Sequence, residues 1–154
     1  MKKKEVKVKT ENSLETIELG ERLSYCLKKG DLILVKGELG AGKSTFIKGI
    51  GKGFKILNEI KSPSFIIVNE YKGKELSLYH IDLYRINGVE IFELGLKEFL
   101  NKGVVAIEWA DKVEEFFSDF DLIEVKIEIL SENERLINII IKGEDLIKRC
   151  YKFH

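Results

Sequence analysis

Residues Asp31 to Ile50, DLILVKGELGAGKSTFIKGI, decide the fold of this chain. The apolar run Leu32–Val35 is typical of a strand buried on both faces of a sheet. It leads into Gly37–Ser44, GELGAGKS, which fits the phosphate-loop pattern G-x-x-x-x-G-K-[ST]. Apolar residues at helical spacing follow the loop, at Phe46, Ile47 and Ile50. A strand, a glycine-rich turn and a helix in this order predict a nucleotide-binding site and make a chance match the weaker interpretation.

The residue types in this loop suit a nucleoside triphosphate. Glycines allow positive φ, so that successive backbone N–H groups can point at phosphate oxygens. The following helix presents a partly positive N-terminus to the same anion. We expect Lys43 to reach the β- and γ-phosphates, Ser44 to face a Mg²⁺ ion and Thr45 to help hold the α-phosphate. The remaining loop residues expected to contact the nucleotide are Glu38, Leu39, Gly40, Ala41 and Gly42.

Composition limits the class of protein. The 154 residues predict a single domain over 1–154, and 26 basic residues balance 26 acidic ones, which argues against strong autonomous binding of nucleic acid. The sequence has no signal-peptide core and no apolar run of about 18 residues, so we expect a cytoplasmic protein with no membrane contact. Cys26 and Cys150 lie far apart and lack a CxxC partner. Buried or inert thiols are therefore expected, rather than a disulfide or a metal site.

The segments before and within the loop region predict a strand and two helices. Glu5–Lys9 alternates charged and apolar residues, as in a short edge strand whose partner the sequence does not identify. Asn12 (or Ser13) is expected to begin a helix that ends in the basic turn Lys28–Gly30. In the helix after the loop, three glycines at positions 49, 51 and 53 are expected to loosen the structure.

The rest of the chain predicts a mixed sheet. Phe65–Val68 and Leu76–Ile81 read as antiparallel strands joined by a turn at Tyr71–Lys74. Leu122–Leu130 and Leu136–Lys142 read as a hairpin at the edge of the sheet, and Glu144–Tyr151 could form a closing helix. We therefore predict an α/β fold of the P-loop NTPase type, a three-layer α/β/α arrangement whose sheet mixes parallel and antiparallel strands.

Two predicted strands end in acidic residues that could approach a metal. Asp82 could meet the Mg²⁺ directly or through water, although a helix cap or an ion pair with Arg85 is the structural alternative. Val104–Trp109 is a second buried run, in which Glu108 stands where phosphate-loop enzymes usually carry an aspartate. His80 is interpreted as packing rather than as a catalytic base, and Trp109 as either core packing or a stacking group.

Four motifs together, GELGAGKST, KSPSF, YHIDLYR and VVAIEW, resemble the TsaE (YjeE) family of small bacterial ATPases. The resemblance covers about Leu14 to Trp109. It implies that Lys43 is the phosphate lysine, that Ser44 and Glu108 are magnesium ligands, and that Asp82 is an essential acid near the metal. Residues 62–64, Ser-Pro-Ser, correspond to a switch-like segment usually written SPT.

The resemblance also implies a function and partners. Members act with the proteins TsaB and TsaD in the threonylcarbamoylation of adenosine 37 of tRNA, so tRNA would be reached indirectly. The position of the base pocket in this family implies that Thr10 and Arg135 lie near the adenine; no other feature of the sequence indicates this. The leading hypothesis is therefore a MgATP-dependent ATPase with Lys43, Asp82 and Glu108 as its catalytic residues, slow by itself because the sequence has only four arginines.

Three other functions remain open. A small-molecule kinase would need an arginine-bearing lid and an acceptor pocket, and the sequence offers neither clearly. A non-catalytic assembly module would use ATP only to order Ser62–Phe65. A GTPase is the weakest alternative, because Asn101–Val104 lacks the aspartate of the NKxD motif that reads guanine.

Overall fold

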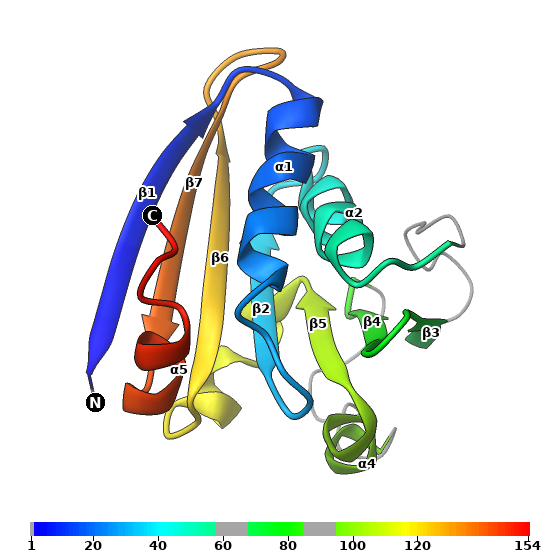
Figure 1. Cartoon of the computed structure of the whole chain (residues 1–154). Coiled ribbons are helices and arrows are strands. Elements are labelled where there is room, and N and C mark those ends of the chain that lie inside the picture. Colours follow the sequence, from blue (N-terminus) through cyan, green and yellow to red (C-terminus); the bar gives the residue numbers. More distant parts are fainter. Residues whose placement is uncertain (1, 58–67, 85–94) are drawn as a thin grey trace.

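The computed structural model describes residues 2–57, 68–84 and 95–154. Within these ranges a seven-stranded sheet has the order β1-β7-β6-β2-β5-β4-β3, with helices on both of its faces (Figure 1). Its strands are β1 (Lys3–Thr10), β2 (Leu32–Gly37), β3 (Val68–Lys72), β4 (Ser77–Asp82), β5 (Val104–Glu108), β6 (Leu122–Ile129) and β7 (Arg135–Lys142). The helices are α1 (Ser13–Ser24), α2 (Lys43–Gly53), α4 (Leu96–Lys102) and α5 (Glu144–Arg149), with the 3₁₀ turns η1 (Ala110–Lys112) and η2 (Glu114–Phe117).

The strand directions confirm the predicted mixed sheet. The central strand β2 runs parallel to both β5 and β6, and β4 runs parallel to β5. The outer pairs β1/β7, β6/β7 and β3/β4 are antiparallel. Parallel central strands bring several carboxyl ends to one edge of the sheet, which is where α/β proteins bind ligands.

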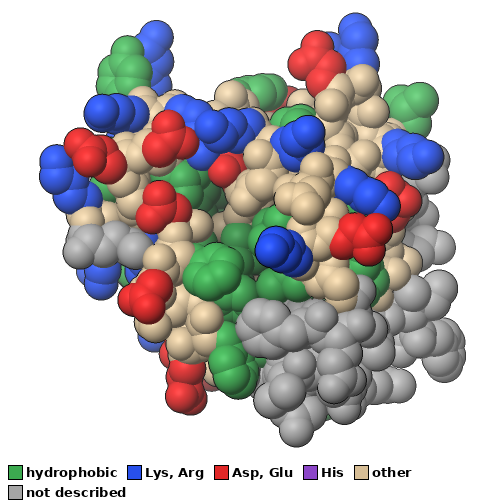
Figure 2. Space-filling view, turned by 90° about the horizontal axis from the view of Figure 1, so that it is seen from below, with side chains coloured by type: hydrophobic (Ala, Val, Ile, Leu, Met, Phe, Trp, Pro, Cys, Tyr) green, Lys and Arg blue, Asp and Glu red, His purple; other side chains and the backbone are tan. Residues whose placement is uncertain are grey.

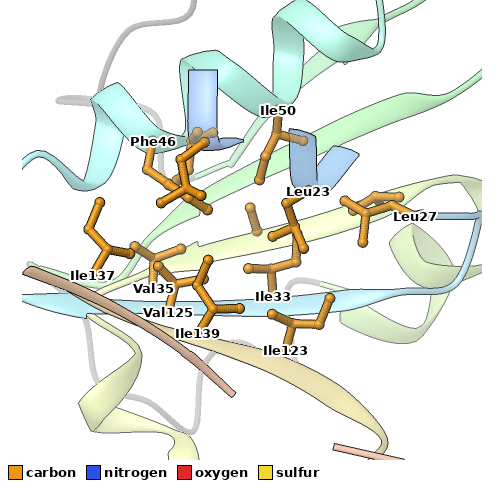
Figure 3. Packing of buried hydrophobic residues seen from close by; sticks show 14 of the residues in the cluster. Leu23, Leu27, Ile33, Val35, Phe46, Ile50, Ile123, Val125, Ile137 and Ile139 are labelled. Atoms are coloured by element: carbon orange, nitrogen blue, oxygen red, sulfur yellow. The ribbon is translucent and has the colours of Figure 1, made fainter. Parts of the chain in front are cut away.

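Two apolar cores, one on each face, hold the layers together. On one face, α1 and α2 pack over side chains of β2, β6 and β7, as the cluster in Figure 3 shows for Phe46, Ile50 and Leu23 above Ile33 and Val125. On the other face, α4, η1 and η2 cover Leu34, Ile81 and Ile107. The continuous apolar run of β2 is explained by this arrangement, because its alternate side chains enter different cores.

The contact between α1 and α2 depends on glycines. A Cβ atom on Gly20 would lie 2.3 Å from the Phe46 carbonyl oxygen, and one on Gly49 would lie 2.1 Å from the Ile17 carbonyl oxygen. The expectation that glycines loosen this segment was wrong, since α2 continues to Gly53. The glycines instead let the two helix backbones approach closely.

Three further boundaries differ from the sequence prediction. The hairpin of β6 and β7 is not at the edge, because β1 adds outside β7 and β6 pairs with β2. Tyr71 belongs to β3, so that the turn begins only after Lys72. Helix α1 is capped by the Asn12 side chain as predicted, but it ends at Ser24, before the basic segment. The predicted strand residues Phe65–Ile67 lie outside the described residues.

A disulfide joins Cys26 to Cys150, across 124 positions of sequence. The prediction of free thiols was therefore wrong. The bridge ties the turn after α1 to the end of α5, where Arg149 also donates to both carboxylate oxygens of Asp31 at 2.8 Å. The C-terminal segment is thus fixed to the base of the strand that leads into the phosphate loop.

Candidate nucleotide-binding site

The phosphate loop joins the end of β2 to the start of α2, as predicted. Gly40 and Gly42 have φ values of +81° and +103°, a left-handed backbone that other residues rarely adopt. Ala41 between them is fully buried, whereas Glu38 and Leu39 are exposed. The two glycines therefore let the loop turn sharply into the N-terminus of α2.

Lys43 crosses back over the mouth of the loop. Its Nζ donates to the carbonyl oxygens of Gly37 at 2.7 Å and Glu38 at 2.9 Å. The same ammonium lies 4.0 Å from the centroid of the Trp109 ring. Burial lowers the pKa of Lys43 from its ordinary value, while the carboxylates of Glu108, Asp111 and Asp82 oppose that shift. The loop thus holds a cation where the terminal phosphates would arrive.

Ser44 and Glu108 meet directly, although 64 positions separate them in the sequence. The Ser44 hydroxyl lies 3.1 Å from each carboxylate oxygen of Glu108. The Glu108 side chain is 5% exposed and also bonds to Nε2 of His80. Glu108 has one methylene more than the aspartate usual at this position, and its carboxylate nevertheless reaches the start of α2.

Asp82 ends the neighbouring strand. The β4/β5 register places it opposite Glu108, and its Oδ1 accepts a hydrogen bond from the Tyr84 N–H at 2.9 Å. Burial raises the pKa of Asp82, the Tyr84 N–H opposes this rise and the Glu108 carboxylate adds to it. An aspartate whose pKa is raised beside a second carboxylate is suited to receive a cation.

The oxygen donors at this edge suit magnesium. Ser44, Glu108 and Asp82 offer a hydroxyl and two carboxylates, the hard ligands that Mg²⁺ uses together with phosphate oxygens. In the described ranges no group of three or more His, Cys, Asp or Glu residues forms a complete metal cage. Mg²⁺ bound with a nucleotide does not require such a cage, since phosphates and water complete its shell.

Arg135 supports the loop from outside. Its Nε donates to the Ala41 carbonyl at 2.9 Å and its Nη2 to the Gly40 carbonyl at 3.3 Å. Thr10 lies opposite Arg135 in the β1/β7 register, but it is 2% exposed and its hydroxyl bonds to Thr16 at 2.8 Å. In this structure Arg135 therefore holds the loop backbone, and Thr10 is a buried neighbour of it.

The remaining residues that the sequence singled out lie either at the start of α2 or outside the residues that the structure describes. Thr45 is partly buried in the first turn of α2. The Ser-Pro-Ser segment at 62–64 and Arg85 lie outside the described residues.

Three features of the site were not predicted from the sequence. Trp109 has a left-handed backbone, with φ of +60°, and its ring also packs against Tyr84. His80 bonds to Glu108, a contact that depends on the register of β4 on β5 and that neither strand signals by itself. Asp111 acts on Lys43 electrostatically, and no sequence pattern signals it.

Comparison with known proteins supports the motif resemblance. The family model described as "Threonylcarbamoyl adenosine biosynthesis protein TsaE" matches residues 10–137. Proteins named tRNA threonylcarbamoyladenosine biosynthesis protein TsaE are similar to this chain in Rickettsia felis (40% identity, 87% of this chain and 79% of that protein), and in Aquifex aeolicus (39%, 84% and 91%). The crystal structure of YdiB from Bacillus subtilis is 32% identical, with a TM-score of 0.83 over 99% of this chain and 96% of that one.

Proposed function

Because the chain belongs to the TsaE family, we propose that it binds MgATP in the Gly37–Ser44 loop and hydrolyses it slowly by itself. One observation carries this proposal. Lys43, Ser44 and the carboxylates of Asp82 and Glu108 come from three separate elements and gather at one end of the sheet. This combination of a cation, a hydroxyl and two acids suits a triphosphate and its metal.

Each residue has a separate role in the proposal. Lys43 exchanges its two carbonyl partners for the β- and γ-phosphates, because a phosphate is a stronger acceptor than a carbonyl. Ser44 and Glu108 would hold the Mg²⁺, whose charge would offset that of the phosphates. Asp82, whose pKa is raised mainly by burial, orients the attacking water and accepts its proton.

The arginines explain why hydrolysis by the isolated chain should be slow. Of the three arginines that the structure describes, Arg22 donates to the His154 carbonyl and Arg149 pairs with Asp31, far from the loop. Arg135 is near, but its guanidinium is engaged with loop carbonyls. Within the described residues, no arginine is therefore placed to stabilise charge on a transferring phosphoryl group.

We further propose that partners complete the site. As the family resemblance implies, these are TsaB and TsaD, with which the chain would support threonylcarbamoylation of adenosine 37 in tRNA in the cytoplasm. Lysines, arginines and acidic side chains are interspersed on the face in Figure 2, without one dominant sign. The described part of that face therefore offers no broad basic surface of the kind that binds tRNA directly. In the described ranges no helix has the length and apolar character to span a bilayer.

Calorimetry with ATP and Mg²⁺ tests the binding step. We expect the wild-type protein to bind, Lys43→Ala to lose most of the affinity, and Ser44→Ala to lose chiefly the dependence on Mg²⁺. Lys48→Ala is the matched control, because Lys48 is an exposed lysine on the same helix. No heat of binding from folded wild-type protein would refute the proposal.

A second experiment separates hydrolysis from a purely structural use of ATP. Phosphate release is measured for the chain alone and with TsaB, TsaD and tRNA, using wild type and Asp82→Ala. We expect turnover to rise with the partners, and Asp82→Ala to bind ATP yet lose both turnover and modification. Modification that persists in Asp82→Ala would favour an assembly module, and phosphate transfer to a small molecule would favour a kinase.

A further inference from the structure

His80 is a completely buried histidine that the proposed function does not yet use. Its Nε2 contacts Oε2 of Glu108, while its Nδ1 is buried and has no hydrogen-bond partner among the described residues. An unpartnered buried nitrogen costs stability, and an apolar side chain of similar size would avoid that cost. Packing alone is therefore a poor reason for a histidine at this position.

The sheet explains how His80 reaches Glu108. In the parallel β4/β5 register, His80 lies opposite Ala106, whose side chain is only a methyl group. Glu108 follows two positions later on the same face, at a diagonal that a long side chain can span. The small neighbour leaves room for the imidazole to lean along β5 toward the carboxylate.

The contact also restricts the orientation of the Glu108 carboxylate. Glutamate has one more rotatable bond than the aspartate usual at this position, so its carboxylate has more orientations to lose on binding a metal. An ionised carboxylate only accepts hydrogen bonds, so we assign the imidazole proton to Nε2, the nitrogen that contacts Glu108. That bond to Oε2, together with the Ser44 hydroxyl 3.1 Å from each carboxylate oxygen, holds the carboxylate in one orientation.

We propose that His80 is a positioning residue that orients the Glu108 carboxylate for Mg²⁺. The inference rests on the proposed function, since it concerns the metal of the nucleotide complex. His80 touches neither the nucleotide nor the metal, and it acts only through Glu108. Removing an outer-shell hydrogen bond of this kind typically lowers metal affinity about 10- to 100-fold.

A pair of near-isosteric variants tests this role. In His80→Gln the amide nitrogen can occupy the place of Nε2, whereas in His80→Asn the shorter side chain places its nitrogen near Nδ1 and cannot reach Glu108. ATP binding is measured by calorimetry over a range of Mg²⁺ concentrations and again in EDTA. We expect His80→Asn to raise the Mg²⁺ concentration for half-maximal effect about 10- to 100-fold. His80→Gln should stay close to wild type, and affinity in EDTA should be the same in all three proteins.

Two controls separate a loss of positioning by His80 from a loss of folding. Thermal unfolding identifies any variant that fails to fold, and the Gln/Asn comparison does not need a larger substitution. In a Glu108→Gln background, His80→Asn should cause no further shift, because the carboxylate through which it acts is gone. Equal Mg²⁺ dependence of Asn and Gln variants would overturn the role of His80 while leaving MgATP binding intact. Failure of wild type to bind ATP would instead overturn the proposed function itself.

Discussion

Removing the Cys26–Cys150 bridge should markedly lower the free energy of unfolding. The bridge closes a loop of 124 positions, for which the chain-entropy estimate is about 5 kcal/mol. Residual structure in the reduced unfolded chain diminishes this value, so about 2–5 kcal/mol is the expected range. For a domain of this size, 1 kcal/mol corresponds to about 2–4 °C in the melting temperature. The full estimate therefore corresponds to a fall of about 10–20 °C.

The ion pair of Asp31 and Arg149 should keep the C-terminal segment in place after reduction. Arg149 donates to both oxygens of Asp31 and to the Cys26 carbonyl, each at 2.8 Å, and these contacts do not require the bridge. The reduced protein should consequently be folded, and its loss of stability should come mainly from a less restricted unfolded state.

Urea unfolding with and without a reductant measures the effect. We expect the reduced protein to unfold at lower urea and with a larger denaturant slope, because its unfolded chain exposes more surface. Cys150→Ser should behave like the reduced wild type and should not respond to reductant. Alkylation of two thiols in unreduced, denatured protein would refute the bridge, and equal unfolding free energies for both redox states would refute the energetic reasoning.

Three further predictions concern helix packing, the loop and the acidic edge. Gly49→Ala should lower the unfolding free energy by about 1–3 kcal/mol in urea, because the added carbon would meet the Ile17 carbonyl at 2.1 Å; an unchanged midpoint would contradict this packing. Arg135→Ala should weaken ATP binding about tenfold in calorimetry, since Gly40 and Ala41 lose their charged donor, and Arg135→Lys should not restore it. Asp82→Asn should raise the melting temperature at pH 7. The pKa of Asp82 in the folded protein lies above its ordinary 3.8, so the ionised form costs stability. The difference in melting temperature between variant and wild type should therefore disappear as pH falls toward 3.8. A difference that stays constant with pH would be inconsistent with ionisation as the cause.

The sequence predicts well the parts of this fold that local residue types determine. The loop from Gly37 to Ser44 has its shape because its glycines are needed at particular φ values, and the pattern states this directly. The alternation in β6 and β7 likewise predicts two strands joined by a short turn. The prediction that this hairpin forms the edge of the sheet was wrong, because β1, from the other end of the chain, pairs with the outer side of β7.

Some contacts between residues far apart in the sequence were features that the sequence did not predict. The spacing of Cys26 and Cys150 carries no signal, because the two residues come together only when the end of α5 packs against the turn that follows α1. The acidic character of Asp82 and Glu108 was visible in the sequence, whereas the link from His80 to Glu108 requires the register of β4 on β5. A register is a property of paired strands, and no single strand specifies it.

The position of Trp109 gives the protein a built-in optical reporter. It is the only tryptophan in the chain, and its indole lies 4.0 Å from the ammonium of Lys43 and also packs against the Tyr84 ring. A ligand that draws the Lys43 cation away from the indole changes the electric field at the ring and hence the colour and intensity of its fluorescence. Arrival of unlabelled ligand at the loop can therefore be followed in real time, by stopped flow, without attaching a dye.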